Sequence, residues 1–219
     1  MMHLKIMLRF IARIFSMLLL LFGLLITFYF GYPFTNNNHK SIFKKSDEEL
    51  AERKKIQSYS DKAKLFCRQH GFNNQICFLI DMHLPSGKNR FFVYDMNKDS
   101  AISYGVVAHG SCNYSFLAMP KFSNKPGCGC SSIGKYKVGN KYTGSFGLAY
   151  KLYGLNASNS NAYKRNIVLH SYYLVPDKEV DPLPVCNSRG CVMVSDKYIG
   201  TLSKTIDASA KPILLGIFE

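Results

Sequence analysis

This sequence lacks several features that would assign it to a repeat protein or a nucleic-acid-binding protein. It has no internal repeat, no low-complexity tract and no nucleic-acid-binding motif. It also has no tryptophan, although 16 Phe, 14 Tyr and a hydrophobic share of 47% among 219 residues are enough for one globular core. We therefore expect one domain of ordinary size with an appendage.

Acidic residues are scarce relative to basic ones. There are 14 Asp and Glu against 28 Lys and Arg, which gives a formal net charge of +14. Such a charge favours anionic surfaces such as phospholipid, wall polymers or nucleic acid, and does not choose among them. Because no recognition motif accompanies the charge, we expect no nucleic-acid partner.

The amino-terminal segment is dominated by an apolar run over residues 15–30. With its apolar flanks the run reaches the ~20 residues that span a bilayer. Three basic residues precede it: Lys5, Arg9 and Arg13. The small-x-small exit of a cleaved signal peptide is missing at 29–33, so we expect residues 1–34 to form a cytoplasmic tail and an uncleaved transmembrane signal anchor. A cleaved signal peptide is the alternative.

Residues 35–75 are expected to form a linker and an amphipathic helix. Ser46 and Glu49 resemble a capping box, and Gly71 is a suitable helix end. Between them, apolar residues recur at steps of three and four and form one face: Ile56, Tyr59, Ala63 and Phe66, with His70 at its edge. We expect this face to pack on a sheet; docking on anionic lipid is the alternative.

Residues 76–219 carry short β-type segments separated by turn signals. Strands are expected at 76–82, 90–95, 101–109, 135–138, 148–153, 167–170, 192–194 and 212–218, the first three being successive and antiparallel. Ser195 is expected to cap a last helix. The fold class is therefore mainly β, a β-sandwich or partly closed barrel with flanking helices.

A histidine and a cysteine in this region have the chemistry of a base and a nucleophile. His170 ends an apolar β-branched run, and Cys191 follows a turn that contains Ser188, Arg189 and Gly190. A neighbouring imidazole or cation activates a thiol, and Arg189 is the candidate cation. The tight turn at Gly190 suggests that the amides of Gly190 and Cys191 face a developing oxyanion. A buried core cysteine or a disulfide is the alternative explanation.

An ordered series of motifs across 78–218 resembles the murein L,D-transpeptidase catalytic domain family, of the YkuD type. The matching segments are 122–124, 131–134, 142–144, 152–156, 161–162, 165–170 and 188–191. The resemblance implies that Cys191 is the nucleophile, His170 the base, and Ser188, Arg189 and Gly190 the supporting turn. Two positions depart from the family pattern: Ser171 stands where Gly is frequent, and Met193 where many members have Arg.

Three further residues are candidates for substrate contact. Ser123 and Asn124 lie in the segment from Gly110 to Ser132. This segment is longer than a loop that only links two strands, so it is expected to form part of the site. His109 ends an expected strand, where it either lines the cleft or has a structural role.

Seven cysteines leave six that could pair if Cys191 is the nucleophile. Cys67 with Cys77 is the expected bridge, and Cys112 is expected to reach Cys128 or Cys130. A bond between Cys186 and Cys191 would block the site. The Cys128-Gly129-Cys130 pair lacks a second matched pair of ligands, so neither a metal nor a cofactor is expected.

The resemblance implies a transferase that acts on peptidoglycan stem tetrapeptides through a Cys191 thioester. Its catalytic domain would lie in the periplasm, held at the bacterial inner membrane by a single-pass helix, and the protein would be a monomer. The alternatives are an L,D-carboxypeptidase, another envelope cysteine peptidase, or a non-catalytic envelope-binding module in which Cys191 pairs with Cys186.

Overall fold

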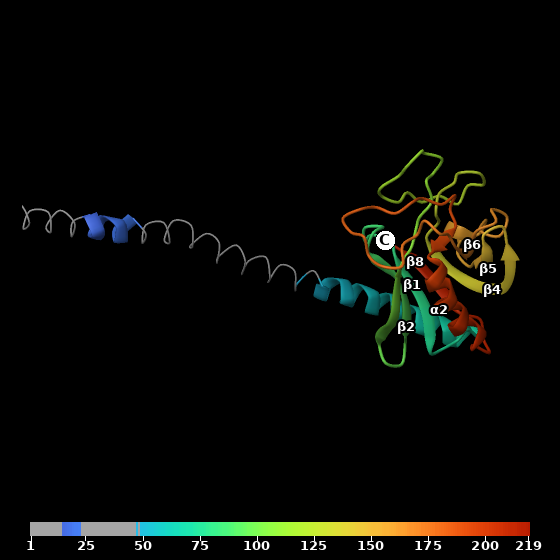
Figure 1. Ribbon diagram of the computed structural model, residues 1–219. Helices are drawn as coiled ribbons and strands as arrows, with labels where there is room; N and C mark the ends of the chain where they lie inside the picture. The colour runs from blue at the N-terminus through green and yellow to red at the C-terminus, as the bar shows by residue number, and fades with distance from the viewer. Residues whose placement is uncertain (1–14, 23–46, 48) are drawn as a thin grey trace, which may run out of the picture. The chain divides into compact units, whose positions relative to one another are not determined.

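The computed structural model describes residues 15–22, 47 and 49–219 (Figure 1). The chain divides into two units, residues 1–54 and 55–219. Residues 15–22 and 49–70 are helical. Most of the expected signal anchor and the Ser46 cap lie outside the described residues. Within the described ranges, no helix is long and apolar enough to cross a membrane.

Eight strands of the described chain form one mixed sheet. They are β1 (Ile76–Asp81), β2 (Asn89–Asp95), β3 (Ser100–Val106), β4 (Gly134–Gly144), β5 (Gly147–Gly154), β6 (Val168–Ser171), β7 (Val192–Val194) and β8 (Leu214–Phe218). Their order across the sheet is β3-β2-β1-β8-β4-β5-β6-β7. The pairs β1–β8 and β6–β7 are parallel and the others antiparallel, so the expected β1-β2-β3 meander is confirmed.

The two edges of this sheet meet at one point. Ala108, just beyond β3, forms an antiparallel bridge with Met193 of β7, and the Ala108 amide donates to the Met193 carbonyl at 2.9 Å. Since β3 and β7 are the terminal strands of the sheet, this contact curls it into a partly closed barrel. The mainly β class is confirmed, and a single curled sheet takes the place of the two-sheet sandwich.

Two helices cover the sheet. Helix α2 (Asp196–Asp207) packs Tyr198, Ile199 and Leu202 into the main core, and its cap is as expected, with the Ser195 hydroxyl accepting from the Tyr198 amide at 3.1 Å. The helical residues 55–70 cover another cluster, to which they contribute buried side chains, including Ile56, Ala63 and Cys67. A short 3-10 helix, η1 (Ala157–Asn159), follows β5.

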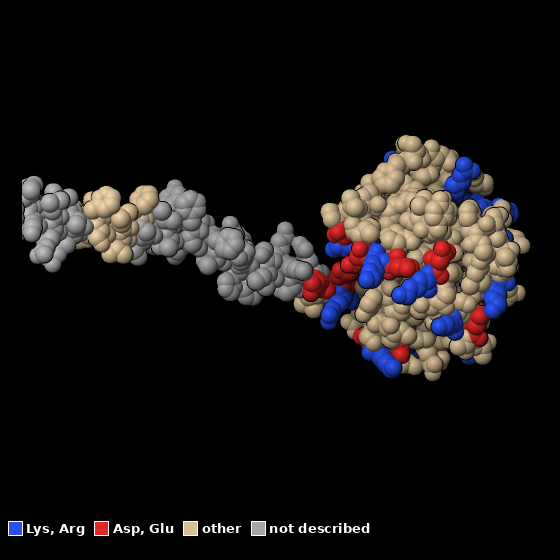
Figure 2. Space-filling view, viewed as in Figure 1, with Lys and Arg blue, Asp and Glu red and all other residues tan. Residues whose placement is uncertain are grey.

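Charged side chains are dispersed over the folded unit. Figure 2 shows most Lys and Arg of this face beside Asp or Glu in a band across its middle, with a few more basic side chains at the upper right. On the face that is visible, the basic excess of the chain therefore forms no continuous patch of the kind that marks a nucleic-acid interface.

The expected bridge between Cys67 and Cys77 is wrong. Both are free thiols, 1% and 0% exposed, inside the same apolar cluster. Burial raises the pKa of the Cys67 thiol to about 11 and also raises the pKa of Cys77. Because the apolar cluster already buries both, they serve as small hydrophobic side chains. The disulfide that is present joins Cys112 to Cys130, one of the two pairings expected.

Burial should protect these two thiols from reagents. We expect Cys67 and Cys77 to react with N-ethylmaleimide only after unfolding, because the reactive thiolate is both inaccessible and disfavoured. Peptide mapping by mass spectrometry reads the result, and the partly exposed thiol of Cys128 is the native-state control. A Cys67–Cys77 peptide pair in a non-reducing map would contradict the prediction.

Candidate active site

The register of β6 and β7 places Cys191 and His170 on the same face of adjacent strands. Leu169 lies opposite Val192 and His170 opposite Met193, so Cys191, just before β7, lies level with Val168. Residues that lie opposite each other on parallel strands point to the same face of the sheet. Cys191 therefore shares a face with Val168 and also with His170, which lies two residues further along β6. With about 3.3 Å per residue and about 4.8 Å between strands, their Cα atoms are about 8 Å apart, a diagonal that an imidazole and a thiol can close.

The face that carries this pair is the one turned away from α2. Leu169, Val192 and Val194 point into the main core together with residues of α2. On the opposite side, Met193 belongs to a smaller cluster, and Cys191 packs against that cluster. The nucleophile candidate is thus at the edge of an apolar patch and not in the centre of the core.

The sulfur of Cys191 is unbonded in this structure. Its Sγ lies 3.6 Å from the Asn166 carbonyl oxygen. Burial raises the pKa of the Cys191 thiol, while a backbone hydrogen bond from Val168 and the charges of Arg165 and Lys151 act to lower it. Burial outweighs the others, so the resting sulfur is a neutral thiol that needs a base.

The imidazole of His170 is oriented by a backbone carbonyl. Its Nδ1 lies 2.8 Å from the Ser171 carbonyl oxygen. A carbonyl can only accept, so Nδ1 carries the proton and Nε2 of the neutral ring keeps a free lone pair. Burial lowers the pKa of His170, which keeps the ring neutral and basic. Because Ser171 acts through its main chain, the departure from Gly does not disturb this orientation.

Phe146 covers His170, although no motif or spacing in the sequence points to it. Phe146, in the hairpin between β4 and β5, stacks on the imidazole with ring centroids 5.1 Å apart and an interplanar angle of 23°. Tyr172 meets Phe146 edge-on at 5.5 Å. Phe146 is itself 57% exposed, so it forms the outer wall of the site.

Removing this ring should raise the pKa of His170. In Phe146→Ala, water reaches the imidazole, and the desolvation that lowers its pKa is relieved, so the value returns toward 6.5. An NMR titration of the His170 ring measures the shift. Tyr173→Ala is the matched control, because Tyr173 is 74% exposed and contacts Tyr172 instead of His170. An unchanged His170 pKa in Phe146→Ala would contradict the role of the ring.

The turn before Cys191 is closed by its own hydrogen bonds. The Ser188 hydroxyl donates to the Cys191 carbonyl at 2.7 Å and accepts from the Gly190 amide at 3.0 Å. Gly190 has φ +105°, and a Cβ there would lie 2.6 Å from the Cys130 carbonyl oxygen. The expectation that the Gly190 amide faces an oxyanion is therefore not met in this structure, because Ser188 already engages that amide.

Arg165, and not Arg189, supplies the cation at this turn. Arg189 is exposed, whereas Arg165 is partly buried and acts on the charge of the Cys191 sulfur. The Arg165 guanidinium donates to the Ser123 carbonyl at 2.9 Å and also to the Cys130 carbonyl. Within the described residues it forms no ion pair with a carboxylate. Its guanidinium is held by these two carbonyls together with the Ser132 hydroxyl and the Cys128 sulfur, so it acts on the Cys191 sulfur through its charge.

Ser123 and Asn124 connect the long loop to the segment around η1. The Asn124 side chain donates to the Ala157 carbonyl at 2.9 Å and accepts from the Asn161 amide at 3.1 Å. The Ser123 carbonyl is the acceptor for Arg165. In this structure both residues hold the long loop against η1 and Arg165, and substrate contact by them stays a prediction.

His109 has a structural role. It is 1% exposed, and burial together with Arg90 lowers its pKa to about 4. Its Nδ1 lies 3.0 Å from Arg90 Nη2, and its Nε2 lies 3.0 Å from the Leu117 carbonyl oxygen. The His109 carbonyl accepts from the Ser188 amide at 2.8 Å. With both ring nitrogens engaged, it supports the nucleophile turn and does not line an open cleft.

Two cavities of about 530 and 500 Å³ lie elsewhere, and neither is lined by Cys191 or His170. The part of the chain that the structure describes contains no group of His, Cys, Asp or Glu that could hold a metal ion.

The curled sheet therefore carries a free thiol and an oriented imidazole on one face of two adjacent strands. The chain belongs to the L,D-transpeptidase catalytic domain family, whose profile matches residues 48–213. The comparison with curated proteins gives no match.

The comparison with solved structures matches this chain to three bacterial proteins, among others. The helical cell shape determining protein Pgp2 from Campylobacter jejuni is 13% identical with a TM-score of 0.45, covering 66% of this chain and 47% of that one. An L,D-transpeptidase from Mycobacterium smegmatis is 11% identical with a TM-score of 0.40, covering 66% and 59%. An L,D-transpeptidase from Xylanimonas cellulosilytica is 11% identical with a TM-score of 0.39, covering 65% and 60%. This chain spans about half to three-fifths of their lengths.

Proposed function

We propose that this protein is a peptidoglycan L,D-transpeptidase that acts on stem tetrapeptides through a thioester at Cys191, with His170 as the general base. The observation that carries the proposal is the placement of a free thiol and an imidazole with an unengaged Nε2 on one face of β6 and β7. Membership of the family supports the choice of peptidoglycan peptides as substrates.

The first half-reaction forms the thioester. The thiol has a raised pKa and the imidazole a lowered one, so the resting pair is neutral, and the proton moves to His170 Nε2 as the sulfur attacks the carbonyl carbon of the L-to-D peptide bond. The C–N bond then breaks, and His170 returns this proton to the amine of the departing D-alanine. The Cys191 amide is the proposed donor to the tetrahedral oxyanion, with Arg165 adding positive charge.

The second half-reaction transfers the acyl group. The amine of a second stem gives a proton to His170 and attacks the thioester carbon, the C–S bond breaks, and the sulfur regains a proton. Water in place of the amine makes the protein a carboxypeptidase. The Phe146 ring over His170 limits the access of water to the base, which favours the amine.

We further propose that the chain is a single-pass protein of the bacterial inner membrane, with its catalytic domain in the periplasm. The apolar run at 15–30 and the basic residues before it support this location. Protease digestion of spheroplasts tests it: the catalytic domain should be cleaved without lysis, and protection until lysis would contradict a periplasmic location.

A product analysis tests the activity. The full chain is incubated with disaccharide-tetrapeptide, and products are followed by mass spectrometry. We expect release of D-alanine and formation of a cross-linked dimer. Release of D-alanine with only tripeptide as product would assign the carboxypeptidase reaction instead. No release from a preparation whose Cys191 reacts with a thiol reagent would overturn the proposed substrate.

A further inference from the structure

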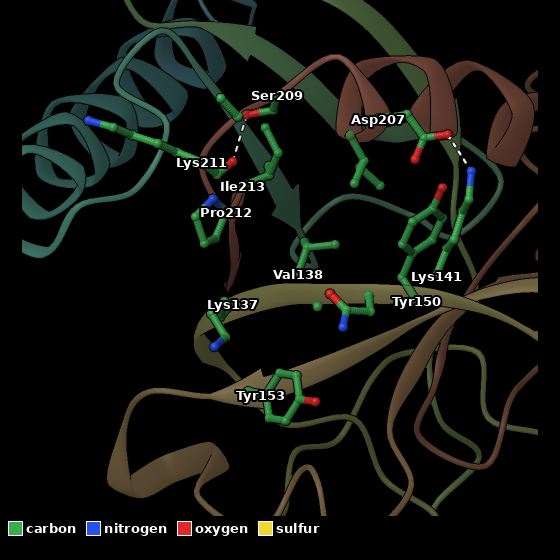
Figure 3. Close-up of a pocket in the computed structure, with 14 residues that line it drawn as sticks. Lys137, Val138, Lys141, Tyr150, Tyr153, Asp207, Ser209, Lys211, Pro212 and Ile213 are labelled. Atoms are coloured by element: carbon green, nitrogen blue, oxygen red, sulfur yellow. Dashed lines mark hydrogen bonds and ion pairs between the residues drawn. The ribbon is translucent and has the colours of Figure 1, made fainter.

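A cavity of about 530 Å³ lies between β4 and the turn that follows α2 (Figure 3). Its wall on the sheet side is formed where β4 contains one extra residue relative to β5, between Val138 and Lys141. A Cβ on Gly139 in this bulge would lie 2.5 Å from the Tyr153 ring. Glycine at this position therefore allows the ring to pack against the bulge, and the bulge and ring together shape the cavity.

One polar atom in the wall of this cavity has no partner. The Tyr150 side chain is fully buried in the main core, and its hydroxyl makes no hydrogen bond in this structure. Figure 3 shows this hydroxyl directed to the end of the cavity where Lys141 and Asp207 pair. A buried hydroxyl without a partner costs free energy that a phenylalanine would not, so its presence indicates a partner that binds there.

The charged groups around the cavity are predominantly basic. Three lysines, Lys137, Lys141 and Lys211, line it against one carboxylate, Asp207. Lys141 Nζ lies 2.8 Å from Asp207 Oδ2, and Lys137 Nζ lies 5.0 Å from the centre of the Tyr153 ring. Figure 3 shows the Lys211 ammonium turned away from the cavity and Lys137 beside Tyr153 on the other side of β4, which leaves Lys141 as the cation next to the Tyr150 hydroxyl.

We propose that this cavity is a binding site for a ligand that carries an oxyanion, either a carboxylate or a phosphate. The oxyanion accepts a hydrogen bond from the Tyr150 hydroxyl and takes the place of Asp207 on Lys141. The Asp207 side chain is 43% exposed and can turn to solvent. The Asp207 carboxylate competes with the ligand for Lys141. The negative end of the α2 dipole also disfavours an anion at this position.

This site is separate from the thiol and its base. Tyr150 lies opposite Leu169 and faces the α2 side of the sheet, whereas Cys191 lies on the other side. The ligand is therefore not the group that reacts at Cys191, and the proposal does not depend on the transpeptidase reaction.

Thermal unfolding of the full chain tests the site with defined probes. Sodium phosphate and sodium succinate represent the two oxyanions, sodium chloride at equal ionic strength is the salt control, and chitotriose is a neutral ligand. We expect phosphate or succinate to raise Tm by about 3 °C at ten times its Kd. The more effective anion identifies the source of the oxyanion. Equal shifts with chloride, or a shift with chitotriose alone, would overturn the proposal.

Two single-site variants separate ligand binding from folding. Tyr150→Phe removes only the unpartnered hydroxyl, so without ligand its Tm should equal or exceed that of the parent, and its affinity for the anion should fall about tenfold. Asp207→Asn removes the competing carboxylate and should bind the anion more tightly. A lower Tm of ligand-free Tyr150→Phe, or an unchanged affinity in that variant, would show that the hydroxyl has another partner and would overturn the proposal.

Discussion

Cys191→Ala should abolish both the release of D-alanine and the formation of cross-links, with a loss of at least about 10⁴-fold in turnover. The proposed reaction passes through a covalent bond to this sulfur, and an alanine offers no atom that can form it. The folded state should change little, by about 1 kcal/mol, because the Sγ atom makes a 3.6 Å contact with the Asn166 carbonyl and one backbone hydrogen bond with Val168, and packs at the edge of a small cluster. Mass spectrometry of the products and a thermal melt measure the two quantities.

A second thiol provides the matched control for this experiment. Cys186 is also free, also partly buried, and packs on the same small cluster as Cys191. We expect Cys186→Ala to keep turnover near that of the parent, since this sulfur is not part of the turn before β7. Turnover that survives in Cys191→Ala but is lost in Cys186→Ala would move the nucleophile to Cys186.

His170→Ala should lose turnover as Cys191→Ala does, because the neutral thiol then lacks its base.

Local sequence patterns predicted the elements of this fold but not their arrangement. The apolar run in Ile76–Asp81 and the cap at Ser195 are local features of the sequence, and both elements form as expected. The parallel pairing of β1 with β8 joins residues more than a hundred positions apart, and no local pattern records it. The same holds for the closing contact between Ala108 and Met193, which decides between a sandwich and a barrel.

The candidate site was predictable in its chemistry but not in its supporting contacts. Cys191 and His170 were identifiable as a thiol and an imidazole in suitable local settings. The expected cation, Arg189, is adjacent in sequence but exposed, whereas Arg165 reaches the site because the carbonyls of Ser123 and Cys130 hold it there. The stacking of Phe146 on His170 depends on how a hairpin folds back over the sheet, and sequence spacing carries no signal for it.

Gly190→Ala should be the most damaging substitution in the turn, costing about 3 kcal/mol of stability and about 100-fold in turnover. Gly190 has φ +105°, which an L side chain rarely adopts, and its new Cβ would lie 2.6 Å from the Cys130 carbonyl oxygen and 3.1 Å from Arg165 Nη2. The carbonyl is main chain and is tied to Arg165, so neither neighbour can yield cheaply. The turn must therefore shift, and Cys191 moves with it. Chemical denaturation and the product assay measure the two losses.

Gly71→Ala isolates the part of this effect that comes from the backbone conformation alone. Gly71 has φ +73°, yet a Cβ there would meet nothing within 4 Å. The residue follows the helical residues 55–70, which cover the apolar cluster that contains Cys67 and Cys77. We expect this control to cost about 1 kcal/mol and to leave turnover unchanged. The difference between the two variants is then the steric conflict with Cys130 and Arg165. The contrary result is a Gly190→Ala variant that loses no more stability than Gly71→Ala and keeps its turnover. That result would show that the close packing of Arg165 and the Cys130 carbonyl against the turn does not position the Cys191 sulfur.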